Sequence, residues 1–233
     1  MERNNFFARF TSRAPAAGPV EFLVVGLGNR HVTPDALGPL AVDKTLVTRH
    51  LFREIPGAVH ERMCPVCAVA PGVLGVTGLE TMETIKGLVD TVRPRVLIAV
   101  DSLAARAVSR LACTVQLSDS GIQPGSGVGN LRRAITQEAL GVKVIAIGVP
   151  MVVYAATIVR DALEQLPQEE ALIEENALDA LAEKLLEGSV GEMIITPREV
   201  DNLVADAAQI VATGINRALH PGLSEQEISE MMD

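Results

Sequence analysis

Short apolar runs alternate along the chain with segments whose apolar residues recur at helical spacing. Continuous runs of this length are typical of strands buried on both faces of a sheet. They are VEFLVVGLGN from Val20, the run at Val66–Ala70, VLIAV at 96–100, TVQL at 114–117 and VKVIAIGV at 142–149. A start signal at Thr33-Pro34 predicts a helix that runs through Ala36 to about His50, and the helical spacing predicts further helices over Glu80–Val92 and over Ser102–Leu111. Strands that alternate with helices predict right-handed crossovers, and therefore an α/β fold with a three-layer, mostly parallel, doubly wound sheet.

The C-terminal part of the chain predicts a long helix that packs on this sheet. Thr196 and Glu199 have the spacing of a capping box, and Pro197 falls at the first helical position. The apolar stripe that follows consists of Val200, Leu203, Val204, Ala207 and Val211. Before it, residues 165–188 are acidic and rich in Ala and Leu, which indicates an exposed pair of helices.

The composition agrees with one globular α/β domain. Of the 233 residues, 48% are hydrophobic but only 3% are aromatic, and cores of Val, Ile, Leu and Ala fit a parallel sheet flanked by helices. We expect a loose N-terminal arm over residues 1–19, a single domain over 20–223 and a C-terminal tail over 224–233.

The net charge and the hydropathy of the chain argue against nucleic-acid and membrane partners and indicate where the protein is located. The net charge of −9 argues against direct nucleic-acid binding, because phosphate contacts require clustered Lys and Arg. No apolar run approaches the ~20 residues that span a bilayer, and the N-terminus lacks the apolar core of a signal peptide. Three cysteines give no disulfide framework, so the sequence predicts a soluble cytoplasmic protein.

The loop after the first run is rich in glycine and carries an acid. Its glycines allow a sharp turn or a close approach to a ligand, but their spacing does not match a dinucleotide fingerprint. Asp35 falls in the first turn of the predicted helix, where a carboxylate either complements the helix dipole or faces a ligand. Gly28, Asn29 and Thr33 are candidate substrate-site residues beside it. His31 is either a proton shuttle or a solvated loop residue, and we favour the latter.

Asp101 immediately follows the run VLIAV, at the predicted carboxyl end of a parallel strand. Open α/β sheets bind ligands at this end, although an Asp here also serves as an N-cap for a helix from Ser102. Two acids at the ends of two strands are expected to face one crevice and to divide acid and base roles through different pKa values. The helix N-terminus favours a charged Asp35, whereas the apolar strand favours a proton on Asp101.

The polar, Gly-rich segment SDSGIQPGSGVGN at 118–130 is either a mobile surface loop or a lid and backbone cradle over a site. Asp119 is a third acidic candidate, although a lone Asp in a loop usually forms a turn. The other candidates in this segment are Ser120, Gly125, Gly127 and Asn130. No G-K-[ST] follows, which excludes a P-loop.

Cys64 and Cys67 form a CxxC motif. Zinc requires two more ligands nearby, and only Cys113 and scattered histidines remain. A redox motif opens a helix, whereas this one leads into an apolar run. We therefore predict ordinary half-buried cysteines, with neither a metal nor a cofactor.

Taken together, these motifs resemble the germination protease family of spore-forming bacteria. The matching segments are VVGLGN (24–29), VTPDALGP (32–39), VTRHL (47–51), PGVLGVTGLET (71–81), DSLAAR (101–106), SDSGIQPGSGVGN (118–130), GVKVIAIGVP (141–150) and ITPREVD (195–201). The resemblance implies an atypical aspartic endopeptidase that degrades small acid-soluble spore proteins, with a fold shared with hydrogenase-maturation proteases and phosphorylases. It implies Asp35 and Asp101 as the catalytic pair, and Glu80, in one matching segment, joins the candidate site residues. It further implies a homo-oligomer such as a tetramer, in the forespore and spore core.

The chain departs from the family pattern in four places. Family members carry a longer N-terminal region with an inhibitory propeptide, as in a zymogen, whereas about 19 residues precede the first run here. The insertion before ITPREVD is shortened, and Ser102 replaces the usual Ala. The family's GxPTVVDA reads GVPMVVYA at 148–155, so Met151 and Tyr154 replace a hydroxyl and an acid at a strand end expected to border the site.

These departures leave three functions open. The first is an endopeptidase whose two carboxylates activate water, weakened by Met151 and Tyr154. The second is a catalytically impaired sporulation or germination protein that keeps the fold for binding. The third is a metal-dependent maturation-type peptidase with Asp35, Asp101 and a His as ligands, which the scarcity of His near these segments opposes.

Overall fold

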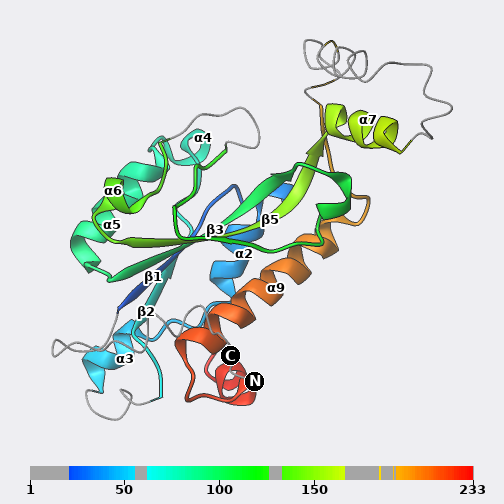
Figure 1. The fold of residues 1–233 in the computed structure, drawn as a ribbon. Helices are drawn as coiled ribbons and strands as arrows, with labels where there is room; N and C mark the ends of the chain where they lie inside the picture. Colours follow the sequence, from blue (N-terminus) through cyan, green and yellow to red (C-terminus); the bar gives the residue numbers. More distant parts are fainter. Residues whose placement is uncertain are drawn as a thin grey trace.

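A computed structural model describes residues 21–55, 62–125, 133–165, 184, 191 and 193–232. Within this part of the chain, six strands form one central sheet in the order β2-β1-β3-β5-β4, with β6 paired to β5 (Figure 1). The strands are β1 Phe22–Gly26, β2 Val66–Val69, β3 Val96–Ala105, β4 Gln116–Ser118, β5 Lys143–Tyr154 and β6 Ile194–Ile195. Strands β2, β1, β3 and β5 are parallel, whereas β4 and β6 are antiparallel to β5. The predicted α/β fold with a mostly parallel sheet is confirmed.

Helices cover both faces of this sheet. Those before β3 are the 3-10 helix η1 Thr33–Asp35, α2 Leu37–Asp43, α3 Arg49–Glu54, α4 Leu74–Thr77 and α5 Thr81–Val92. Those after it are the 3-10 helix η2 Val108–Arg110, α6 Gln137–Leu140, α7 Ala155–Glu164, α9 Val200–Leu219 and α10 Glu225–Glu230. Helices α2 and α9 pack on one face and α5 on the other, while α7 extends beyond the end of β5 (Figure 1).

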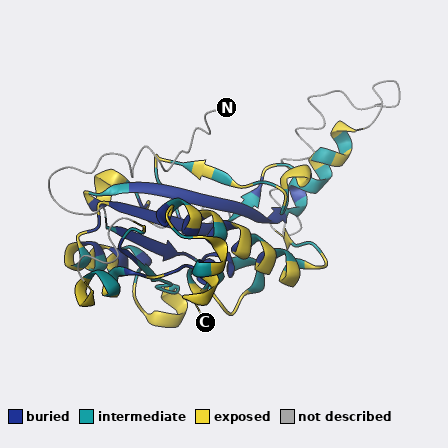
Figure 2. Cartoon of the chain, turned by 90° about the horizontal axis from the view of Figure 1, so that it is seen from below, coloured by how far each residue is buried: buried dark blue, intermediate teal, exposed yellow. Residues whose placement is uncertain are grey.

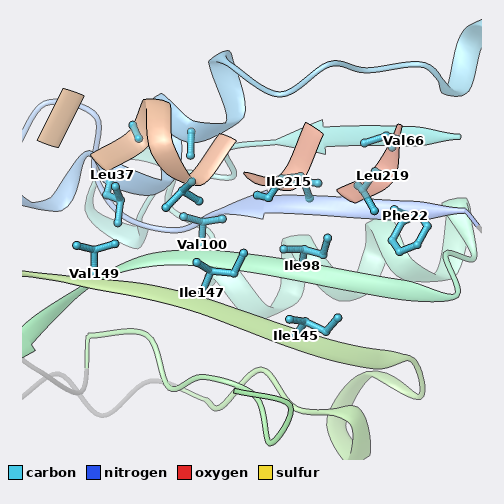
Figure 3. Close-up of a cluster of buried hydrophobic side chains, with 14 of the residues drawn as sticks. Phe22, Leu37, Val66, Ile98, Val100, Ile145, Ile147, Val149, Ile215 and Leu219 are labelled. Atoms are coloured by element: carbon cyan, nitrogen blue, oxygen red, sulfur yellow. The ribbon is translucent and has the colours of Figure 1, made fainter. Parts of the chain in front are cut away.

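The core follows the two-residue alternation of the strands. In β1, Phe22 and Val24 join the cluster under α2 and α9, whereas Leu23 and Val25 join the cluster under α5. Figure 3 shows the first cluster, in which strand side chains point toward Leu37 of α2 and toward Ile215 and Leu219 of α9. Burial on both faces explains why the strands read as continuous apolar runs, and Figure 2 shows them as the buried centre of the molecule.

Two predicted helices differ in the structure. The helix predicted over Ser102–Leu111 is wrong, because β3 continues to Ala105 and pairs with β5 along that length. The helix predicted to start at Thr33-Pro34 and to run to about His50 is divided into η1, α2 and α3. The side chain of Thr48 accounts for the interruption between α2 and α3. Its hydroxyl donates to Cys64 O at 2.6 Å and accepts from Val66 N at 3.0 Å. These bonds attach the chain to β2 in place of helical bonds.

The C-terminal helix packs on the sheet as predicted, but it begins later. Val204 and Val211 of the predicted stripe are buried. The predicted capping box is wrong, because α9 starts at Val200 without a side-chain cap. Pairing of β6 with β5 holds the preceding residues extended. The capping box of this region lies at the start of α10, within the segment predicted as a tail, where Ser224 and Glu227 bond reciprocally.

Some predictions fall on parts of the chain outside the described residues. These are the N-terminal arm over 1–19 and most of the helix pair over 165–188. None of the helices in the described ranges is long and apolar enough to cross a membrane.

A buried histidine makes the stability of the fold depend on pH. His220 is 1% exposed, and burial lowers the pKa of its imidazole below the ordinary 6.5. Its Nε2 lies 3.3 Å from Leu46 O, and its Nδ1 is buried without a partner in the described chain. Because the unfolded state binds the proton more readily, stability is fully present above pH 6.5 and falls as the pH drops below it.

We therefore expect the free energy of unfolding to fall less between pH 7.5 and 5.5 in His220→Gln than in the unchanged chain. Each tenfold weakening of proton binding in the folded state corresponds to about 1.4 kcal/mol of this difference. Urea denaturation at several pH values measures it. His50→Gln, at an exposed position on α3, serves as the control and should keep the original slope. Equal slopes in all three proteins would contradict the assignment to His220.

Candidate active site

Two glycines allow α2 to lie against the ends of β1 and β3. A Cβ at Gly38 would lie 2.2 Å from Leu27 O and 2.6 Å from Val100 O, and one at Gly26 would lie 2.2 Å from Gly38 O. No other residue fits this contact without moving the backbone. The close approach holds η1, which directly precedes α2, at the carboxyl edge of the sheet.

Asp35 is the last residue of η1, and its carboxylate is held by the loop that leaves β1. The Asn29 N–H donates to Asp35 Oδ2 at 2.7 Å. Gly28, between Asn29 and the strand, adopts a φ of 107°, and a Cβ there would lie 2.0 Å from Asp35 O. The glycine therefore allows the loop to wrap around the half-buried Asp35 and to orient its side chain.

This contact predicts a defect in Gly28→Ala. The added Cβ must displace the Asp35 backbone, and the positive φ is itself strained by about 1–3 kcal/mol. We expect a lower melting temperature and at least a tenfold loss of any peptidase activity that depends on Asp35. The matched control is Gly87→Ala on α5, where nothing lies within 4 Å of the new Cβ and the helix should gain about 0.5–1 kcal/mol. Unchanged activity and stability in Gly28→Ala would show that the contact is not needed.

Asp101 lies inside β3 and not at its carboxyl end, because β3 continues past it. Strand β1 ends at Gly26, which pairs with Val100, so Asp101 is the first residue of β3 beyond the end of β1. The position is 4% exposed. The predicted crevice at a strand end is thus formed by the end of β1, and Asp101 reaches it from the neighbouring strand.

Asp35 and Asp101 line the same cavity, which has a volume of about 410 Å³. The other lining residues come from several elements. They are Gly28, Asn29, Val32, Pro34, Val73, Thr81, Ser102, Leu103, Ala104, Pro124, Gly125, Val152 and Ile194. The site thus combines two carboxylates with mainly apolar and backbone surface. Among the described residues, no group of three or more His, Cys, Asp and Glu side chains is placed to hold a metal ion.

Several predicted site residues line this cavity and others do not. Gly28, Asn29 and Gly125 are in the lining. The candidates outside it are Thr33 in η1, Glu80 at the N-cap of α5, and the exposed Asp119 and Ser120. In that loop the Ser118 and Ser120 hydroxyls bond each other at 2.7 Å, as in an ordinary turn. Gly127 and Asn130 lie outside the described residues.

Met151 and Tyr154 lie outside the lining of this cavity, although the sequence predicts them at a strand end that borders the site. Strand β5 runs through both positions, to Tyr154. The Met151 side chain is fully buried in the cluster under α2 and α9. Tyr154 lines a neighbouring cavity of about 650 Å³, together with Arg106, Arg110 and Arg160 among others, and this cavity shares Leu103 and Ala104 with the first. Neither residue stands among the described lining residues of the cavity that holds the two acids.

The strand residues that form the floor of the cavity are absent from the candidates that the sequence indicates. The sequence predicts a helix for Ser102, Leu103 and Ala104, and Val152 and Ile194 belong to strands far apart in the chain. The hydroxyl of Ser102 is buried and has no hydrogen-bond partner in the described part of the chain. The only sequence feature that pointed to this position was the replacement of the family's usual Ala by Ser102.

The remaining candidates have ordinary roles. His31 is exposed, which agrees with a solvated loop residue. Cys64 and Cys67 are half-buried as predicted, and burial raises the pKa of both thiols, which opposes thiolate chemistry.

Comparison with known proteins gives a consistent result. The model of the germination protease family matches residues 4–170 and 170–232. The germination protease of Clostridium perfringens strain 13 is 44% identical over 225 residues, which cover 91% of this chain and 69% of that protein. The germination protease of Caldanaerobacter subterraneus is 46% identical over 226 residues, covering 90% and 69%. That of Bacillus subtilis strain 168 is 39% identical over 264 residues, covering 94% and 72%.

Among solved structures, the [NiFe] hydrogenase maturation protease HycI from Thermococcus kodakarensis aligns with a TM-score of 0.44 and 16% identity. The alignment covers 87% of this chain and 94% of that chain. The match of the family model over most of the chain, and the sequence identities of 39–46% to germination proteases, show that this chain belongs to the germination protease family, a family of spore proteases.

Proposed function

We propose that this chain is an endopeptidase that cleaves small acid-soluble spore proteins, with Asp35 and Asp101 activating a water molecule. The observation that carries the proposal is the single cavity lined by both acids, which come from separate elements of the fold. Membership of a protease family supplies the reaction class, and the resemblance supplies the substrate. We also propose that the protein acts as a homo-oligomer in the spore.

The surroundings of the two carboxyl groups favour different roles. The Asn29 N–H donates to Asp35, and such a bond stabilises the charged form of a carboxylate. Asp101 is almost completely buried at the end of an apolar stretch, where a negative charge is poorly solvated. We assign Asp35 as the general base and Asp101 as the general acid.

In this assignment, Asp35 takes a proton from water while the water oxygen attacks the carbonyl carbon of the scissile peptide bond. Asp101 then gives its proton to the amide nitrogen as the C–N bond breaks, which leaves a carboxylic acid and an amine. Solvent exchange returns Asp35 to its charged form and Asp101 to its protonated form. The reaction consumes one water and needs no other reactant.

Incubation of the purified protein with a small acid-soluble spore protein tests this proposal. We expect fragments in a digestion time course, at the same rate with and without EDTA, because the proposed mechanism uses no metal ion. An unrelated unfolded protein at the same concentration serves as the specificity control. Loss of cleavage in EDTA, restored by added Zn²⁺, would support the metal-dependent alternative. Absence of cleavage with intact folding would support the impaired-protein alternative.

A further inference from the structure

The edge of β3 beside the two acids pairs with no described strand. On one side, β3 pairs with β5 along its whole length, to Ala105 opposite Val153. On the other side, it pairs with β1 only as far as Val100. Residues 101–105 therefore continue past the end of β1 with one edge of the strand open within the described structure. Three of them, Ser102, Leu103 and Ala104, line the cavity that also holds Asp35 and Asp101.

The direction of the open backbone groups follows from the last bond to the β1 side. The Val100 carbonyl accepts from Leu27 N at 2.8 Å, so Val100 directs its polar groups toward β1. Polar backbone groups alternate between the two edges of a strand, so those of Ser102 and Ala104 point to the same side as those of Val100. The chain that leaves β1 turns at Gly28, whose φ is 107°, and Gly28 and Asn29 line the cavity together with Ser102, Leu103 and Ala104.

We propose that the polypeptide substrate binds here as an added strand, along the line of β1, with hydrogen bonds to the backbone of Ser102 and Ala104. This inference rests on the proposed endopeptidase function. The occupant is an extended segment of about four residues. Paired strands have nearly the same rise of about 3.3 Å per residue, so this length matches residues 102–105, the part of β3 beyond Asp101. Strand addition to an open sheet edge is a common way to bind extended peptides independently of their side chains.

The position of the open edge of β3 would bring the backbone of a bound peptide next to the two carboxylates. Asp101 lies at the start of the open segment, and Asp35 faces the same cavity from η1. A strand added at Ser102 and Ala104 therefore carries its backbone directly past both carboxylates. A register shift in β5 between the partners of Leu103 and Ala104 lies beside the same segment, as bulges often do at active sites.

A scan of N-methylated substrate peptides tests the proposal. The probe is a synthetic peptide that spans a cleavage site mapped by mass spectrometry on a small acid-soluble spore protein. Each amide except the scissile one is methylated in turn. Only one edge of an added strand faces β3, so we expect at least a tenfold loss of kcat/KM at two positions spaced two residues apart, and little loss between them.

The outcomes separate this inference from the proposed function. Failure of the protein to cleave the unmethylated peptide or its parent spore protein would overturn the endopeptidase proposal itself. Cleavage of the unmethylated peptide, with equal effects at all methylated positions or with none, would overturn strand addition alone.

A variant supplies a second measurement on the protein side. Ala104→Pro removes an N–H that faces the open edge and leaves the bonds to β5 in place. We expect a raised KM, a nearly unchanged kcat and a cooperative thermal transition. A folded Ala104→Pro with unchanged KM would contradict the role of this edge, and if the variant does not fold the peptide scan decides alone.

Discussion

Replacement of Asp35 or Asp101 by Asn is expected to lower kcat/KM for cleavage of a small acid-soluble spore protein by about 10²–10⁴-fold. An amide side chain is nearly isosteric with a carboxyl group but neither accepts a proton from water nor donates one to the leaving nitrogen. In the proposed mechanism the two groups act on one reaction, so the double variant should lose little more than the stronger single variant.

The fold should survive both replacements. In Asp35→Asn the new amide would still present an oxygen to the Asn29 N–H, and Asp101→Asn would place a neutral group at a buried position. Circular dichroism and thermal denaturation check this point. The matched control is Asp90→Asn at an exposed position of α5, remote from the lining of the cavity, which should retain full activity. Retained activity in a folded Asp35→Asn or Asp101→Asn would remove that residue from the mechanism.

The strand pattern of the fold was predictable because burial on both faces leaves a strong local signal. The run VLIAV is apolar throughout and VKVIAIGV is apolar apart from Lys143, and both contribute buried residues to parallel strands. That Asp35 and Asp101 line one cavity was predictable for a related reason. Each follows a feature that local sequence marks clearly, namely a glycine-rich turn and the end of an apolar run.

The floor of the cavity was not predictable, because tertiary pairing decides its structure. The segment SLAA at 102–105 contains Leu and Ala, which favour a helix in isolation. In the folded chain it pairs residue by residue with β5, and this pairing outweighs the local preference. The contribution of Ile194 depends on β6, which pairs with β5 although about 40 residues separate the two strands in the chain. No local pattern carries such information.

The positions of Met151 and Tyr154 change the expected effect of restoring the family residues. The sequence alone predicts that both weaken catalysis from a strand end beside the site. Since neither lines the cavity of the two acids, we expect Met151→Thr and Tyr154→Asp, alone or together, to give no gain in the rate of spore-protein cleavage.

Met151→Thr is instead expected to destabilise the fold. Met151 is fully buried between β5 and the helices α2 and α9, so the shorter side chain leaves a void and buries a hydroxyl in an apolar cluster. The two effects together should lower the free energy of unfolding by about 2–4 kcal/mol. Urea denaturation measures this loss, with the isosteric Met151→Leu as control, which should change stability by less than about 1.5 kcal/mol.

Tyr154→Asp is expected to affect stability much less than Met151→Thr. The Tyr154 side chain lines a cavity whose lining includes Arg106, Arg110 and Arg160. An acid at this position therefore lies near positive charge and should lower the free energy of unfolding far less than Thr at position 151. Stability and a digestion time course are measured on the same preparations of both single variants and the double variant. A faster cleavage rate in Met151→Thr or in the double variant, at equal concentration of folded protein, would contradict this expectation. It would show that the buried residue 151 of β5 affects catalysis although it does not line the cavity.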